Sequence, residues 1–454
     1  MKEVHKLLLV NPTAPQWQVT SGKGPRRGTK TFRFSMLPSL YVAASLPPDV
    51  KAQIIDEDVQ PIDFNTDAEI IGISFMTFNA PRAYEIADRF RNEHGKTVIF
   101  GGYHPTFMPE EAERHADAIC IGEAEPNMKH IIVDYRLGRL QKRYCNGLAD
   151  VSQLPELNRN LIDKSQYITP WAIQATRGCP HHCSFCSVSA FHRHNHRPRP
   201  IDAVIEELRG MGKHVLFMDD NLVGQPEYAK ELFARMIPLK KIWFGQGGIN
   251  VAYDDEMRRL AEASGCHGMF IGFESLSEDN LRDYHKRYNK ASEYKKVVKV
   301  LHDSGIAVFA GFVFGLDHDQ ANVFRTTLEF LHESQIDLLQ ATIQTPFPGT
   351  PLFKEMDRKG RIFCKDWTRY DFTQVVFEPT HMSRYTLKHG CDWLRSHFYS
   401  QPAIWRRIYR AAGYMPAYLA FASVGITNYH YRTRCVVNHI AESGKHYRGP
   451  VDAA

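Results

Sequence analysis

The first 145 residues alternate short apolar runs with amphipathic stretches. The apolar runs predict strands and lie at Lys6–Val10, Ala52–Asp56, Ile70–Met76, Thr97–Phe100 and Ala118–Ile121. Helical patterns lie at Arg82–His94, Pro109–His115 and Pro126–Arg136. This alternation predicts an N-terminal α/β domain, residues 1–145, built on a flavodoxin-like and mostly parallel sheet.

Residues 146–170 carry turn signals and predict a connector. The alternation of strands and helices then restarts, with strands predicted at Ala172–Thr176, His214–Met218, Ile242–Gly245, Gly268–Phe273, Ala307–Phe314 and Leu338–Ile343. Helical stretches such as Ile201–Met211, Asp254–Ser264 and Lys290–Ser304 separate them. These units predict a partial (βα)6 barrel over residues 171–377, open on one side, and a mainly helical C-terminal region over residues 378–454.

Segments that follow the strands are the candidate binding positions, because parallel sheets bind ligands beyond the carboxyl ends of their strands. In the N-terminal half these segments are polar, small or glycine-rich, and glycine lets a bulky ligand approach the backbone closely. The candidates there are Thr77, Gly101, Gly102, His104, Thr106, Gly122 and Glu123. A flavodoxin-like domain that holds no cofactor is the alternative.

Three cysteines with the spacing C-x-x-x-C-x-x-C lie in the loop after the first predicted barrel strand. These residues, Cys179, Cys183 and Cys186, suit three corners of one [4Fe–4S] cluster and leave the fourth iron without a protein ligand. An open iron can bind a reactant. The alternative is a structural zinc site in which His181 or His182 completes a Cys₃His tetrahedron. Metal analysis separates the two, with about four irons per chain expected for the cluster.

Composition and charge are those of an ordinary globular protein. The chain has 454 residues, 43% hydrophobic and 24% charged, and a formal net charge of +5. Because the basic residues are scattered among 51 acidic ones, no nucleic-acid partner is expected. No apolar run predicts a transmembrane helix or a signal peptide. Nine cysteines without a secretion signal predict a reducing, cytoplasmic location.

The cysteine loop closely resembles the signature of the radical S-adenosylmethionine (SAM) family, including the aromatic Phe185 just before the last cysteine. The resemblance covers roughly residues 171–377. It implies that the open iron binds SAM and that an electron from the cluster cleaves SAM to a 5′-deoxyadenosyl radical. An external electron donor of the flavodoxin or ferredoxin type is implied as well.

This resemblance also implies SAM contacts near the ends of the barrel strands. Asp219, Asp220 and Asn221 correspond to polar groups that receive the SAM amino group, and an Asx turn with a helix cap is a compatible interpretation. Glu274 with Ser275 corresponds to the contact with the ribose or the methionine end.

Three further rim segments are candidates for SAM or substrate contacts. The segment with Gly311 and Phe312 resembles the one that packs on adenine. Gln246 and Gln344 follow the third and sixth predicted strands and are expected to contact SAM or substrate.

The N-terminal half resembles the cobalamin-binding domain that precedes many radical SAM enzymes. The shared segments are Gly-Gly-Tyr-His-Pro-Thr, residues 101–106, and Gly-Glu-Ala-Glu, residues 122–125. The Asp-x-His-x-x-Gly motif, which replaces the lower base of cobalamin in some such domains, is absent from the sequence. His104 is therefore not assumed to be an axial cobalt ligand.

Together these resemblances imply a cobalamin-dependent C-methyltransferase acting on an unactivated carbon of a small-molecule or lipid-like substrate. One alternative is an oxidative cyclase or ring-forming enzyme acting on a tetrapyrrole or lipid. Methylthio transfer fits less well, because those enzymes carry three additional N-terminal cysteines, and only Cys120 and Cys145 are present there. A non-catalytic iron–sulfur or zinc module is the alternative from another class.

Two segments outside these motifs receive structural interpretations. Residues Phe191–Arg199 hold three histidines and three arginines, and an exposed, solvated loop is favoured over an anion contact. The aromatic C-terminal region predicts core packing, with a cap over the open barrel mouth or an apolar substrate contact as alternatives.

Overall fold

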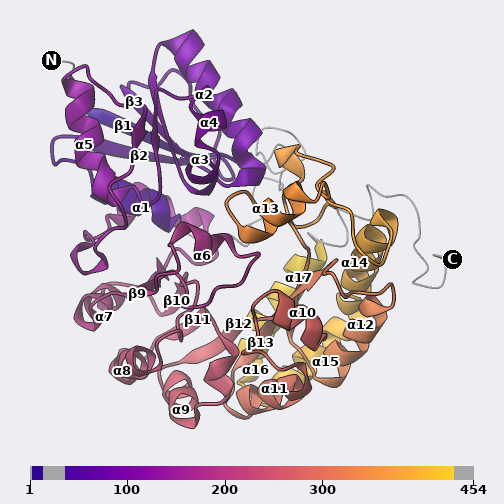
Figure 1. Cartoon of the computed structure of the whole chain (residues 1–454). Coiled ribbons are helices and arrows are strands. Elements are labelled where there is room, and N and C mark those ends of the chain that lie inside the picture. The colour runs from indigo at the N-terminus through magenta and orange to yellow at the C-terminus, as the bar shows by residue number, and fades with distance from the viewer. Residues whose placement is uncertain (1–2, 14–35, 434–454) are drawn as a thin grey trace.

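The computed structural model describes residues 3–13 and 36–433 of the chain. Figure 1 shows two sheets with their own helices and, beside the second sheet, the helices of the C-terminal region. Each sheet has six strands, and all pairings within both sheets are parallel. Among the described residues, none of the helices has the length and apolar character needed to cross a membrane.

The first sheet has the strand order β2-β1-β3-β4-β5-β6. Its strands are β1 Lys6–Asn11, β2 Lys51–Asp56, β3 Ile70–Ser74, β4 Thr97–Gly101, β5 Ala118–Cys120 and β6 Arg143–Tyr144. The helices are α1 Leu37–Ala44, α2 Ala80–His94, α3 Tyr103–Phe107, α4 Pro109–Ala112 and α5 Glu125–Arg136. Because side chains alternate along a strand, Leu7 packs in one apolar cluster with Ile131 of α5, while Leu8 packs in another with Phe90 of α2.

The second sheet has the order β14-β13-β12-β11-β10-β7 and curves into an open barrel. Its strands are β7 Ala172–Ile173, β10 His214–Phe217, β11 Ile242–Gly247, β12 Cys266–Glu274, β13 Ala307–Phe314 and β14 Leu338–Ile343. The helices of this domain are α6 Ser187–Phe191, α7 Ile201–Arg209, α8 Pro226–Met236, α9 Asp255–Ala263, α10 Glu278–Asp283, α11 Tyr294–Asp303, α12 Val323–Glu333 and α13 Pro351–Arg358. A small antiparallel pair, β8 Thr176–Arg177 with β9 Arg197–Pro198, flanks the cysteine loop.

The C-terminal helices close the exposed edge of the barrel at β14. They are α14 Arg384–Phe398, α15 Gln401–Ala411, α16 Ala417–Leu419, the π-helix η11 Ala420–Gly425 and α17 Ile426–Arg432. The Tyr399 hydroxyl accepts a hydrogen bond from the Leu339 amide and donates one to the Leu339 carbonyl, while Arg395 donates to the Ala341 carbonyl. These contacts satisfy backbone groups that an edge strand would otherwise leave unpaired. The described part of this region, up to residue 433, therefore covers the edge of the barrel at β14.

Most predicted elements are confirmed, and the differences lie at their ends. The predicted helix Pro109–His115 ends at Ala112, and the predicted first barrel strand ends at Ile173 because Thr176 pairs with Pro198 instead. Helix α1 and the two-residue strand β6 were not predicted from the sequence. Both are too short for a clear hydrophobic period.

Candidate active site at the junction of the two domains

The cysteine loop lies between β8 and α6, beyond the carboxyl end of β7. Cys183 is buried, whereas Cys179 and Cys186 are half-buried. Burial raises the pKa of the Cys183 thiol to about 11, although the charge of Lys286 opposes the shift. In the described part of the chain, no three His, Cys, Asp or Glu side chains converge tightly enough to ligate one metal ion. The C-x-x-x-C-x-x-C spacing in the sequence suits a cluster, whose irons each take one cysteine.

Two neighbouring side chains reach the sulfurs of this loop. The side-chain amide of Asn221 lies 3.7 Å from Cys179 Sγ, and its carbonyl oxygen accepts a hydrogen bond from the Gly248 amide. The Tyr288 hydroxyl lies 3.8 Å from Cys183 Sγ. The Tyr288 ring stacks on His181, which belongs to the cysteine loop, at a centroid distance of 3.8 Å. Sequence reasoning missed Tyr288, because no motif places this residue beside the cysteines.

The two aspartates after β10 play different roles. Asp219 is buried and accepts hydrogen bonds from the amides of Ala175 and Thr176, so it supports the start of the cysteine loop. Burial raises the pKa of the Asp219 carboxyl to about 7, although these hydrogen bonds oppose the shift. Asp220 accepts a hydrogen bond from the Gly178 amide and is half-buried. Of the two, Asp220 is the carboxylate available to a ligand.

The loop after β12 presents an ion pair beside the cysteines. Glu274 has a backbone φ of +67°, at an irregularity in the pairing of β12 with β13, and its carboxylate binds the Lys286 ammonium. Ser275 is buried and caps the following turn through the Ser277 amide. On β11, the next strand toward β7, Gln246 is exposed and donates to the Asp220 carbonyl.

The remaining candidates on the barrel strands do not all face the inside of the barrel. Phe312 stacks on Phe273 with ring centroids 5.9 Å apart and lies in the core between sheet and helices. Its ring therefore does not face the site, which corrects the expected adenine contact. The adjacent Gly311 does face inward, since a Cβ there would meet the half-buried Phe270. Gln344 is buried near Tyr284, and within the described residues its amide atoms form no hydrogen bond of ordinary length and angle.

Phe185 lies half-buried in the cysteine loop and packs against the apolar core, with its ring centroid 6.1 Å from that of Tyr284. This placement supports the loop just before the last cysteine.

In the N-terminal domain, the candidate loops meet at the carboxyl edge of the first sheet. Thr106 Oγ1 accepts a hydrogen bond from the Gly122 amide and so joins the loops after β4 and β5. A Cβ at Gly122 would meet no atom within 4 Å, and Gly101 is half-buried, so both leave space for a ligand. Gly102 differs, because its Cβ would lie 2.7 Å from the Phe75 carbonyl oxygen.

His104 is fully buried beneath this edge. One ring nitrogen lies 3.3 Å from the hydroxyl of Thr77, and the other lies 3.0 Å from the hydroxyl of Tyr84. The ring is thus engaged within the protein. Two other buried polar atoms near the loops, Asn11 Nδ2 and Asn79 Oδ1, have no hydrogen-bond partner among the residues that the structure describes. These two atoms suit a ligand rich in amide groups, as cobalamin is.

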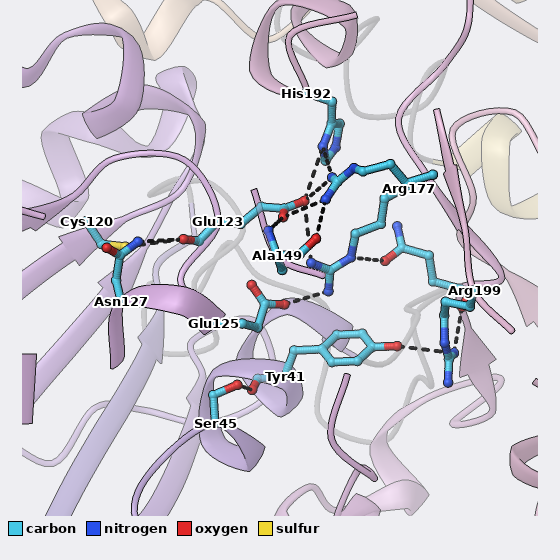
Figure 2. Close-up of polar contacts among 12 residues, drawn as sticks. Tyr41, Ser45, Cys120, Glu123, Glu125, Asn127, Ala149, Arg177, His192 and Arg199 are labelled. Atoms are coloured by element: carbon cyan, nitrogen blue, oxygen red, sulfur yellow. Dashed lines mark hydrogen bonds and ion pairs between the residues drawn. The ribbon is translucent and has the colours of Figure 1, made fainter. Parts of the chain in front are cut away.

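A buried ion-pair network joins the two domains, as Figure 2 shows. The Glu123 carboxylate binds Arg197 at 2.5 Å and Arg177 at 3.4 Å, and it also accepts a hydrogen bond from the Ala149 amide. His192 lies 3.3 Å from the same carboxylate. Burial opposes ionisation of Glu123, but His192 and the two arginines outweigh it and hold the pKa of Glu123 well below its usual range.

This network corrects the interpretation of Phe191–Arg199 as a solvated loop. His192 and Arg199 are buried, and Arg199 pairs with Glu207 at 2.8 Å. The middle of the segment, Arg193, His194 and Asn195, matches the expected exposure. Charge pattern could not reveal the partners, because Glu123 lies in another domain and far away in the sequence.

The site thus combines a three-cysteine loop in an open parallel barrel with a second parallel sheet whose loops face it, and this arrangement defines a radical SAM protein with an accessory domain. The radical SAM superfamily model matches residues 173–331, and the B12 binding domain model matches residues 36–132. The chain is 34% identical over 421 residues to bacteriochlorophyllide d C-12(1)-methyltransferase of Chlorobaculum tepidum, with 90% of each chain covered. The chain therefore belongs to the family of cobalamin-dependent radical SAM enzymes, whose cofactors are a [4Fe–4S] cluster, SAM and cobalamin.

A second relative agrees with this membership, and a solved structure agrees with the fold. Bacteriochlorophyllide d C-8(2)-methyltransferase of the same organism is 31% identical over 365 residues, covering 75% of this chain and 80% of the relative. The fold is similar to that of the radical SAM methyltransferase TsrM from Kitasatospora setae, solved with cobalamin and a [4Fe–4S] cluster bound. That structure has a TM-score of 0.62 and 15% identity, and the match covers 79% of this chain and 78% of TsrM.

Proposed function

We propose that the protein is a C-methyltransferase that acts on a tetrapyrrole of the bacteriochlorophyllide type. The observation that carries this proposal is the identity of 34% across 90% of the chain to an enzyme named for that reaction. A second relative named for methylation of the same type of molecule, at another position, supports the substrate class.

The inner face of the barrel supports an apolar substrate. Phe244, Phe270 and Phe309 are half-buried there, while their neighbours along each strand are packed under the helices. Gly268 and Gly311 make room for these rings, since a Cβ at Gly268 would lie 2.5 Å from Phe244 and one at Gly311 2.7 Å from Phe270. An aromatic floor of this kind excludes water and gives a large flat molecule apolar contact.

We assign the cluster to Cys179, Cys183 and Cys186, and the SAM contacts to Asp220, Gln246, Glu274 and Gln344. The bound cofactors supply a one-electron reductant, a hydrogen-abstracting radical and a methyl donor. The chain's own residues provide binding and orientation. Asp220 offers a carboxylate to an ammonium, and Asn221 and Tyr288 orient two of the cysteine sulfurs. The ion pairs of Glu123 hold the cobalamin domain over the barrel, which keeps the reacting groups in line.

Product mass tests the proposed reaction. The reconstituted enzyme, SAM, cobalamin, a strong reductant and a bacteriochlorophyllide should yield 5′-deoxyadenosine and a product heavier by one methylene unit. Loss of hydrogen or gain of oxygen in the product would instead support the cyclase alternative. Formation of no 5′-deoxyadenosine with an intact cluster would contradict both.

Three further assignments belong to this proposal. The domain division is 1–145 for the cobalamin domain, 146–170 for the linker, 171–377 for the barrel and 378–454 for the C-terminal region. The electron donor is a flavodoxin or a ferredoxin, since the cluster needs a low-potential one-electron source. The protein works in the cytoplasm, where its thiols stay reduced.

A further inference from the structure

The C-terminal helices expose a concentration of aromatic side chains. α15 packs against the segment α16–η11–α17, and a Cβ at Gly425 would lie 3.1 Å from the side chain of Ile408. Trp405 and Tyr409, one helical turn apart on α15, are 55% and 83% exposed. The neighbouring segment exposes Tyr418, Phe421 and Ile426 by 64%, 51% and 46%. Large apolar side chains exposed together mark an interaction surface more often than those exposed singly.

The charge of this region is one-sided. Residues 393–441 contain no Asp or Glu, and their basic residues are Arg395, Arg406, Arg407, Arg410, Arg432 and Arg434. Arg395 and Arg407 are buried and donate to the Ala341 carbonyl and to Asn428, respectively. Arg406 is exposed and Arg410 half-buried beside Trp405 and Tyr409, and in the part of the chain described neither forms an ion pair. Exposed apolar rings and unpaired positive charge therefore occur together.

The exposed apolar side chains and the two arginines together form what is here called the aromatic–arginine face: Trp405, Arg406, Tyr409, Arg410, Tyr418, Phe421 and Ile426. We propose that this face docks the protein on a membrane surface that contains anionic lipid. Trp and Tyr side chains prefer the headgroup level of a bilayer, and apolar side chains on one helix face enter the boundary with the acyl chains. Arginines near the surface add attraction to anionic headgroups.

Other occupants fit the charges less well. A second copy of the chain would bring the same arginines face to face in a symmetric dimer. Residues 434–454 carry Arg434, Lys445 and Arg448 with only Glu442 and Asp452, so they do not neutralise the face. Single-stranded nucleic acid also stacks on aromatic rings, but its binding draws on a groove of positive charge along the nucleic-acid backbone. This face contains only the exposed Arg406 and the half-buried Arg410.

The position of the face leaves the active site free. Ala411 and Leu419, on the helices that carry the face, pack in one apolar cluster with Ile242 and Ala307. These two are the first residues of β11 and β13, at the amino end of the barrel, whereas the cysteine loop follows the carboxyl end of β7. Docking at this end keeps the junction of the two domains open to substrate.

Vesicle binding by the full-length protein tests the proposal. Sedimentation with vesicles of phosphatidylcholine mixed with phosphatidylglycerol should show roughly 30-fold tighter binding than with phosphatidylcholine alone, given two contributing arginines. Arg406→Gln with Arg410→Gln should remove most of that difference. Trp405→Ser with Tyr409→Ser should weaken binding to both kinds of vesicle. The matched controls are Tyr253→Ser, at an exposed tyrosine outside the face, and Lys129→Gln with Lys213→Gln, at two exposed lysines elsewhere.

A second readout locates the contact. Brominated lipid should quench tryptophan fluorescence in the wild-type protein and should quench much less in Trp405→Phe, which keeps an apolar ring and should fold. Absence of vesicle binding, or binding that both double variants retain, would overturn the proposal. Self-association lost in the Trp405 and Tyr409 variant would assign the face to a second copy, and competition by a single-stranded oligonucleotide would assign it to nucleic acid.

Discussion

The Tyr288 hydroxyl lies 3.8 Å from the sulfur of Cys183, across 105 residues of sequence. Burial, followed by the charge of Cys183, raises the pKa of Tyr288 well above its ordinary value, so the hydroxyl stays protonated and is able to donate. Hydrogen bonds to cluster sulfurs stabilise the more negative, reduced state. The relationship therefore links a loop after β12 to the ease with which the cluster accepts an electron.

Tyr288→Phe should lower the midpoint potential of the reconstituted cluster. Loss of one hydrogen bond of about 1 kcal/mol corresponds to about 40 mV for a one-electron couple. Redox titration followed by electron paramagnetic resonance measures the change. Tyr284→Phe is the control, since this tyrosine lies in the same loop and its hydroxyl contacts none of the three cysteines in the described structure. An equal shift in both variants would mean that the hydroxyl of Tyr288 is not responsible.

Cys183→Ala should abolish both the visible absorbance of the cluster and reductive cleavage of SAM. Three thiolates hold the cluster, and loss of the buried one leaves an iron without its ligand. Iron content and 5′-deoxyadenosine formation are the measurements. Cys145→Ala, at an exposed cysteine away from the loop, should retain both. Retention of either property in Cys183→Ala would show that the ligands are assigned wrongly.

Glu123→Gln should loosen the contact between the domains. Breaking a buried ion pair costs about 3 kcal/mol. The Ala149 amide donates a hydrogen bond to Glu123, and its rate of hydrogen exchange should therefore rise roughly a hundredfold. Glu113→Gln, which weakens the more exposed pair with Arg143, is the control and should leave this exchange rate almost unchanged.

This contribution of Glu123 should depend on pH in a defined direction. Because the folded protein holds the pKa of Glu123 below its ordinary 4.5, the stabilisation is fully present above that value and is lost as the pH falls toward the lower folded pKa. The difference in exchange rate between wild type and Glu123→Gln should be constant near neutral pH and should shrink on acidification below the ordinary value of 4.5. A difference that grows on acidification would contradict the ion-pair explanation.

Gly102→Ala should mainly reduce the stability of the protein, whereas Gly122→Ala should mainly weaken cobalamin binding. A Cβ at Gly102, where φ is +99°, meets the backbone of Phe75, so this variant should lose about 2 kcal/mol or more of unfolding free energy. Gly122 has a φ of +80° and open space around the added carbon, so its variant should lose about 1 kcal/mol from backbone strain. Gly122→Ala should also bind cobalamin more weakly. Thermal unfolding and cobalamin titration separate the two effects, and unchanged cobalamin affinity in Gly122→Ala would remove this glycine from the proposed site.

The sequence alone was sufficient for most of the strand–helix order, the two parallel sheets and the three-cysteine loop. Strand and helix periods are local properties, and C-x-x-x-C-x-x-C is a contiguous motif, so both are visible without coordinates. The tertiary structure decided which polar residues face the site. Alternation along β13 turned Phe312 into the core, and Asp219 bound the backbone of the cysteine loop. The partners Tyr288 and Cys183, and Glu123 and Arg197, meet only because the chain brings distant segments together, and no local pattern encodes such pairing.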